Sequence, residues 1–306
     1  MIPAIIQWVE RPAQRARRHP LLGYFVLAFG VTWAWHTVFL GVLELPFESP
    51  VMGIGAFAGP TLAAFVMAGL ADGRPGVRGL LRAYVAWRAS PWWYLVAIAG
   101  LPVLFLLVML ALQPAAIGSF RPPTTAFLIS ALGLYPHILL LGGPLAEEPG
   151  WRGFALPRLE RRFGPLPGTL LLGALHAAWH LPLYLYVPGY NMAPPEPVGT
   201  AVSFAVFSVG IAGLTVIFTW MYNSTGGGLP LMILLHASVN TAGLLPTLFP
   251  DLAPEGSDVV RTVALVGVAV LLAVVTRGRL AWPRAERHRP GVPDRAQPRR
   301  TARSDR

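Results

Sequence analysis

Two adjacent carboxylates and a guanidinium stand in an otherwise apolar part of the sequence. Glu147, Glu148 and Arg152 follow a long apolar run, and ionisable residues in such a setting are costly to bury, so they indicate function by default. Glu148 and Arg152 have the spacing and order that favour an ion pair on one helix face. On such a helix the side chain of Glu147 points about 100° away from that of Glu148. We therefore predict one structural carboxylate and one that acts as a general base.

Two later segments carry side chains that could complete such a site. His180 and Glu147 lie almost equally far from a Gly-Pro turn between them, so a helical hairpin would bring both to the same depth. His176 precedes His180 by one helical turn and shares its face. His236 and Asn240 repeat that spacing and could donate two hydrogen bonds to a developing oxyanion. A purely structural role, as hydrogen bonds between helices, stays open for each set.

The composition indicates a membrane protein. The chain has 306 residues, of which 54% are hydrophobic and only 12% charged, with a mean hydropathy of +0.55. Soluble domains are about one quarter charged. The absence of cysteine excludes disulfides, iron–sulfur clusters and a thiol nucleophile. The net charge of +10 comes from Arg alone, and in this apolar context it favours anionic lipid over nucleic acid as a partner.

Apolar runs of about 20 residues, the length that spans a bilayer, predict an all-α, polytopic fold with about eight transmembrane helices. We expect a basic N-terminal segment at 1–20, a transmembrane domain at 21–276, and a disordered Arg- and Pro-rich tail at 277–306. The predicted spans are Leu21–Leu43, Val51–Leu70, Trp92–Leu112, Thr124–Leu145, Pro165–Val187, Gly199–Tyr222, Leu229–Phe249 and Asp258–Val275.

Charges alternate along the loops between these spans. Arg gathers in the N-terminal segment, at 74–88, at 152–162 and in the tail, whereas the intervening loops carry acids such as Glu44, Glu196 and Asp251. Because Arg-rich segments stay on the cytoplasmic side, both termini are predicted to be cytoplasmic. We expect an integral protein of a bacterial plasma membrane, with anionic lipid at its Arg-rich cytoplasmic face.

Together these residues resemble the CAAX-protease and bacteriocin-processing family of intramembrane proteases, which includes bacterial Abi proteins. The family carries an EExxxR motif, here within EEPGWRGFALPRL, then an aromatic residue four positions before a His, then HxxxN or HxxxD. The resemblance covers roughly residues 132–243. The motifs are met in order by Glu147, Glu148 and Arg152; by His180, with His176 in place of the aromatic residue; and by His236 and Asn240.

The resemblance implies an Rce1-like helical core, at about 124–250, with a cavity open to the cytoplasm. In it Glu147 would activate a water, helped by His180, while His236 and Asn240 would stabilise the oxyanion. Supporting positions would be Glu148, Arg152 and His176.

The implied function is an intramembrane endopeptidase, resembling a metalloprotease, that acts on a peptide or membrane-protein substrate. Two mechanisms stay open: zinc held by Glu147, His180 and His236, or a glutamate mechanism without metal. The alternative is a non-catalytic membrane scaffold or bacteriocin-immunity protein of the same fold. A transporter with a proton relay is less well supported, because no inverted repeat is evident in the sequence.

Overall fold

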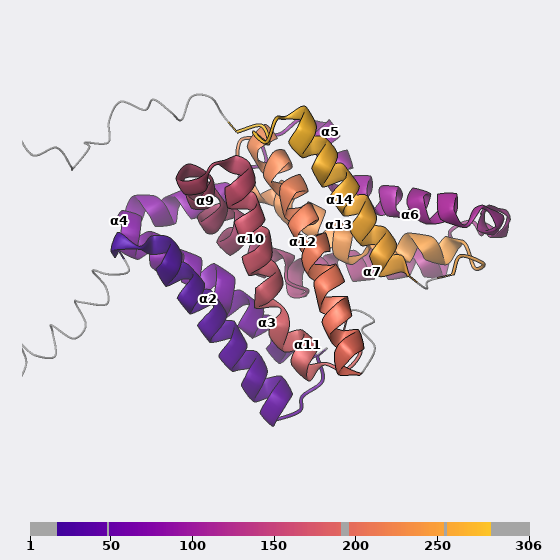
Figure 1. Cartoon of the computed structure of the whole chain (residues 1–306), viewed down its shortest axis with the longest axis horizontal. Helices are drawn as coiled ribbons and strands as arrows, with labels where there is room; N and C mark the ends of the chain where they lie inside the picture. Colours follow the sequence, from indigo (N-terminus) through magenta and orange to yellow (C-terminus); the bar gives the residue numbers. More distant parts are fainter. Residues whose placement is uncertain (1–16, 48, 191–195, 254–255, 283–306) are drawn as a thin grey trace, which may run out of the picture.

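The computed structural model describes residues 17–47, 49–190, 196–253 and 256–282, and every regular element among them is a helix (Figure 1). The predicted all-α fold is confirmed. Most of the predicted N-terminal segment 1–20 and tail 277–306 lies outside the described residues. The α-helices are α2 (Pro20–His36), α3 (Pro50–Ala56), α4 (Ala63–Tyr84), α5 (Pro91–Leu95), α6 (Leu101–Leu112), α7 (Thr125–Leu141), α8 (Pro144–Glu148), α9 (Leu156–Phe163), α10 (Pro165–Trp179), α11 (Leu181–Tyr186), α12 (Pro197–Ser224), α13 (Leu229–Asn240) and α14 (Ser257–Val275).

Several of these helices join into membrane-spanning segments. Within the described residues, six runs are long and apolar enough to cross a bilayer, and a seventh results if α13 and Ala242–Leu248, bent by 43°, form one span. The fold is therefore polytopic, as predicted. The six runs are Pro20–Val42, Pro50–Tyr84, Pro91–Leu112, Thr125–Phe163, Pro197–Ser224 and Ser257–Val275.

The count differs from the predicted eight at Pro165–Val187. There α10 has 15 residues and α11 has 6, with a break at His180. A helix as short as α10 rises about 22 Å, less than the apolar core of about 30 Å. The break has a local cause, because Pro182 has no N–H to donate to the carbonyl of Ala178. His180 thus stands at the C-terminal end of α10 instead of in mid-span.

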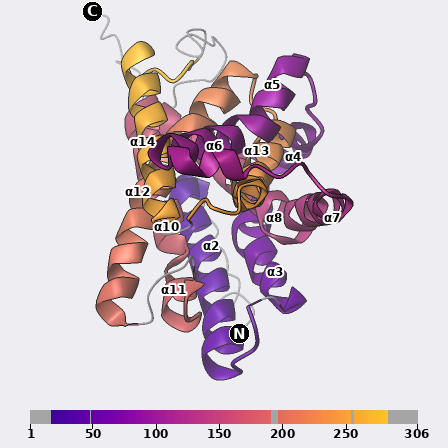
Figure 2. The ribbon, with the colours of Figure 1, turned by 90° about the vertical axis from the view of Figure 1, so that its right-hand side faces the viewer.

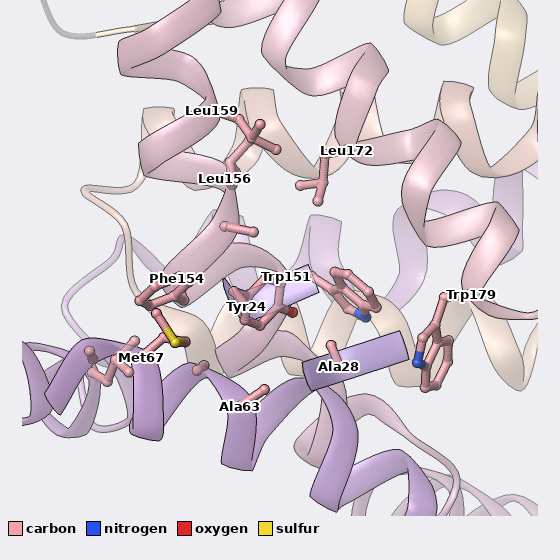
Figure 3. Close-up of a cluster of buried hydrophobic side chains, with 14 residues drawn as sticks. Tyr24, Ala28, Ala63, Met67, Trp151, Phe154, Leu156, Leu159, Leu172 and Trp179 are labelled. Carbon is pink, nitrogen blue, oxygen red and sulfur yellow. The ribbon is translucent and has the colours of Figure 1, made fainter. Parts of the chain in front are cut away.

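A cluster of buried side chains surrounds Trp151 (Figure 3). The ring centroid of Tyr24 lies 5.9 Å from that of Trp151 and 5.1 Å from that of Phe154. Gly150 permits this close packing, since an added Cβ would lie 2.5 Å from both the carbonyl oxygen of Pro60 and the hydroxyl of Tyr24. The segment that carries the paired carboxylates is thereby fixed against α2 and the residues around Pro60.

One end of the molecule, here called the Arg-rich end, gathers the basic segments. In Figure 1, α4, α5 and α9 lie in the upper part of the molecule, and α14 ends there. Asp72 of α4 pairs with Arg158 of α9. The amide of Asn223, near the end of α12, donates to Glu160 at 2.7 Å and to the carbonyl of Leu280 at 3.0 Å. The described arginines of these segments are Arg17, Arg18, Arg74, Arg78, Arg82, Arg88, Arg158, Arg161, Arg162, Arg277 and Arg279.

The opposite end, here called the Arg-poor end, holds the loops that follow α2 and α11 (Figures 1 and 2). The rings of Phe47 and Tyr190 meet there with centroids 5.6 Å apart. The hydroxyls of Thr37 and Tyr186 lie 3.4 Å apart. The charge separation that the sequence predicts is thus present between the two ends. That the Arg-rich end faces the cytoplasm stays a prediction.

Candidate active site

The paired carboxylates sit on a short helix with an unusual entry and exit. α8 begins after Gly143, whose φ of +105° is one that side chains rarely allow, and Pro144 occupies its first turn. The N–H groups of Ala146 and Glu147 both donate to the carbonyl of Gly143 at 2.8 Å. After α8 the chain continues without a break into a π-helix, Pro149–Ala155. Glu147 and Glu148 are both buried.

Glu147 contacts the first of the two histidines on α10. Its Oε2 lies 3.1 Å from Nε2 of His176, which is itself buried. Because a carboxylate can only accept, the neutral His176 ring donates from Nε2. A ring nitrogen of His180 lies within 4.8 Å of a ligand atom from each of these two residues. The α9–α10 hairpin, which turns at Gly164 with φ +87°, thus brings Glu147 beside both histidines.

His180 is oriented by the backbone of its own helix. Its Nδ1 lies 2.9 Å from the carbonyl oxygen of His176. A carbonyl accepts, so Nδ1 carries the proton, and Nε2 of the neutral ring keeps a free lone pair. This arrangement leaves one nitrogen of His180 available as a base, a hydrogen-bond acceptor or a metal ligand.

Glu148 forms an ion pair with Arg152 and also contacts His236. Its Oε1 accepts from Nη1 of Arg152 at 2.9 Å and from Nδ1 of His236 at 2.7 Å. Both Glu148 and Arg152 are almost fully buried, and the Arg152 guanidinium lies 4.0 Å from the centroid of the Phe218 ring. His236 is therefore held by Glu148 through Nδ1, which leaves its Nε2 free to act on another group.

A cavity of about 800 Å³ opens beside these side chains. Asn240, at the exposed end of α13 and one turn after His236, lines it as well. Glu148 does not belong to the wall and stands behind Arg152 and His236. Of the residues singled out from the sequence, those that line the cavity are Glu147, Arg152, His176, His180, His236 and Asn240.

The same region matches a known family. Residues 134–242 match the family described as type II CAAX prenyl endopeptidase, Rce1-like. The helical core within these residues is similar to that family. The resemblance seen in the sequence is confirmed. A curated relative, "CAAX prenyl protease 2" of Methanococcus maripaludis, is 29% identical over 103 residues, which are 33% of this chain and 37% of the relative. The match thus spans little more than a third of the relative's length.

The donor set of the Rce1-like core fits zinc in type and spacing. Glu147, His176 and His180 each offer one ligand atom, all within 4.8 Å of one another, and two histidines with one glutamate are a zinc set that leaves a position open. A metal-bound histidine normally donates its other N–H to a partner. His180 does so, whereas Nδ1 of His176 is buried without a partner. Of the two histidines, His180 is thus the better oriented to bind a metal ion.

This set differs from the one that the sequence predicts. The prediction groups Glu147 and His180 with His236, but among the described residues the cluster of three contains His176, and His236 bonds Glu148 instead. The reason is geometric: the bent end of α10 lets both of its histidines reach Glu147. The rotation of α13, by contrast, aims Nδ1 of His236 at the neighbouring carboxylate.

Two further histidines line the cavity. His36 and His137 have no partner at helical spacing in their own spans, and the sequence therefore predicts packing roles for them. In the structure both lie in the cavity wall. His36 is buried, and its Nδ1 has no hydrogen-bond partner among the described residues, while His137 is exposed. A titratable residue in an apolar span indicates function by default, and this signal is present in the sequence for both histidines.

Proposed function

We propose that this protein is an intramembrane endopeptidase in which Glu147 activates the attacking water. One observation carries the proposal: Glu147, His180 and His236 line one cavity, and hydrogen bonds at Nδ1 leave Nε2 of each histidine free. General base, acceptor and donor groups around a shared space are what peptide hydrolysis requires. The Rce1-like match is a second, independent support.

The proposed reaction uses side chains of the chain itself. Glu147 takes a proton from water as its oxygen bonds to the scissile carbonyl carbon, and His180 accepts the second hydrogen bond of that water. The oxygen of the tetrahedral intermediate receives hydrogen bonds from Nε2–H of His236 and from the amide of Asn240. When the C–N bond breaks, Glu147 returns its proton to the leaving amine.

The buried residues behind the cavity position these groups. His176 donates to Oε2 of Glu147 and holds that carboxylate in place. Glu148, held by Arg152, fixes the ring of His236. A zinc ion bound by Glu147, His176 and His180 would polarise the carbonyl and make the water more acidic. The hydrogen bonds that His236 and Asn240 donate to the oxyanion would serve in either case.

The proposed substrate is an apolar peptide or membrane-protein segment. The Rce1-like relative is named for CAAX prenyl substrates, and most side chains in the cavity wall are apolar, among them Met52, Ile54 and Phe207. Such a wall suits a prenyl chain or an apolar peptide side chain. We further propose a bacterial plasma membrane as the location, with anionic lipid at the Arg-rich end.

Proteolysis in liposomes tests this proposal. The purified protein is given a quenched-fluorescent peptide library, and Glu147→Gln is expected to abolish cleavage because it removes the base and keeps the shape. Glu196→Gln, at an exposed position that precedes α12, is the matched control and should cleave as the parent does. Retained cleavage in Glu147→Gln would overturn the mechanism. Equal biological activity of parent and Glu147→Gln in cells would favour the scaffold.

A chelator separates the two forms of the mechanism. Metal-free hydrolysis predicts that cleavage survives treatment with a strong zinc chelator. A loss that added zinc restores would assign Glu147, His176 and His180 to a metal. Metal analysis of the untreated protein and of His176→Gln provides a readout besides activity.

A further inference from the structure

One buried polar side chain in the cavity wall has no part in the proposed reaction. His36, the last residue of α2, lines the same cavity as Glu147 and is only 3% exposed. Its Nδ1 is buried and has no hydrogen-bond partner among the described residues. A buried polar atom without a partner costs free energy and is uncommon in native proteins. At a cavity wall, such a side chain is a candidate contact for a ligand.

The end of α2 that carries His36 is fixed against two elements that border the cavity, α3 and α10 (Figure 1). The indole N–H of Trp33 donates to the carbonyl of Trp179, at the end of α10, at 3.1 Å. The indole N–H of Trp35 donates to the carbonyl of Val51, in α3, at 2.9 Å. Both tryptophans lie within three residues of His36. The backbone of His36 is therefore held in place without a ligand, which reduces the entropy that binding would cost.

The accessible nitrogen of the His36 ring is Nε2. Nδ1 is enclosed by protein, while the residue belongs to the cavity wall, so Nε2 is the nitrogen that a bound peptide can reach. The carboxylate of Glu147 is close enough to the ring to act on it electrostatically. A peptide whose scissile bond lies at Glu147 thus comes within reach of His36.

His36 and the proposed oxyanion donors belong to different elements. His236 and Asn240 are on α13, and Figure 1 shows α2 and α13 on opposite sides of α10. A contact from α2 therefore falls on a part of the peptide other than the scissile carbonyl. Each residue of an extended peptide offers a backbone carbonyl and, unless it is proline, an N–H. In a mostly apolar cavity these groups lose free energy unless they find a partner.

We infer that His36 is a substrate-binding residue, whose Nε2 forms a hydrogen bond with the peptide backbone beside the scissile bond. This rests on the proposed function and names a residue that holds the substrate. The hydrogen bond is present in the bound peptide and in the transition state alike, so its loss raises KM and leaves kcat nearly unchanged. Because the ring is unpaired in the empty protein, replacing it with an apolar side chain should not lower the melting temperature.

Two variants of similar shape test the hydrogen bond. Met and Gln are both unbranched and good helix formers, but only the amide of Gln can form a hydrogen bond where Nε2 stands. With a quenched-fluorescent peptide that the parent cleaves, His36→Met should raise KM about tenfold, as expected for one lost hydrogen bond. His36→Gln should keep KM within about threefold of the parent value, and kcat should change by less than about twofold in both variants.

The matched control is His19→Met. His19 directly precedes the same helix, is exposed and makes no capping hydrogen bond, so this variant should cleave as the parent does. A KM of His36→Met equal to that of the parent would overturn the inference. An equal rise of KM in His36→Gln would overturn it as well, because the effect would then come from the shape of the ring. A fall in kcat at unchanged KM would also contradict it.

Cysteine labelling separates this inference from the proposed function. The chain has no cysteine, so His36→Cys carries a single thiol, which N-ethylmaleimide should modify in detergent micelles. Peptides of the library should slow this modification, and they should do so equally when Glu147→Gln is added, because binding needs no catalysis. If the parent cleaves no peptide, the endopeptidase proposal fails, and absence of protection at His36→Cys would overturn the inference too. If the parent cleaves peptides that do not protect His36→Cys, the inference fails and the proposed function stands.

Discussion

The packed side and the open side of the candidate active site are built differently. Behind the carboxylates, the side chains of the Trp151 cluster are buried and tightly packed. Gly150 there contacts both α2 and the chain at Pro60. Across the cavity, α7 contributes to the wall and buries none of its residues. The groups to which we assign the reaction thus stand on the tightly packed side. They face α7, which makes few buried contacts with the rest of the protein.

This difference suits a site that must hold its own geometry and still admit a large apolar substrate. Catalytic groups need supporting residues that fix their positions, and here Arg152 and His176 provide that support from buried positions. Regions with few buried contacts open at low cost in free energy. The comparison predicts that changes behind the carboxylates reduce stability, whereas comparable changes in α7 do not.

Arg152→Ala is expected to have the largest effect on stability. It would leave the Glu148 carboxylate buried with only His236 as a partner, and breaking one member of a buried ion pair costs about 3–5 kcal/mol. Thermal unfolding in detergent micelles measures the loss. Arg161→Ala, which removes an exposed arginine from the neighbouring helix, is the control and should change little. If both variants unfold alike, the buried pair does not support the site.

Two glycines compare the packed side and α7 directly. Gly150→Ala would place a methyl group 2.5 Å from backbone and hydroxyl oxygens, and overpacking of this kind costs about 1–3 kcal/mol. Gly133→Ala, in α7, meets nothing within 4 Å and should stabilise its helix by about 0.5–1 kcal/mol. The two melting temperatures should shift in opposite directions. Equal destabilisation would mean that α7 is as tightly packed as the Trp151 cluster.

Features that depend on local sequence could be predicted, and features that depend on packing between distant segments could not. Hydropathy predicts the spans because length and apolarity alone decide whether a helix can cross a bilayer. The Glu148–Arg152 pair follows from helical spacing. Which histidine contacts which carboxylate does not follow, because His176 and His180 share one face and the choice depends on the break at Pro182. The rotation of α13, which aims His236 at Glu148, is set by packing against distant segments and leaves no local signal.

Removal of an exposed ion pair at the Arg-rich end should have the smallest effect. Asp72 and Arg158 are paired, but their side chains are 47% and 17% exposed, and such pairs contribute about 0–1 kcal/mol. Asp72→Asn should therefore lower the melting temperature only slightly, and less in high salt, because salt screens exposed charges. Comparison of the melting temperatures of Asp72→Asn and Arg152→Ala shows how far the stabilisation by a charge pair depends on its burial. A loss as large as that of Arg152→Ala would indicate that charge pairs at the surface, not the packed cluster around Trp151, stabilise the Arg-rich end.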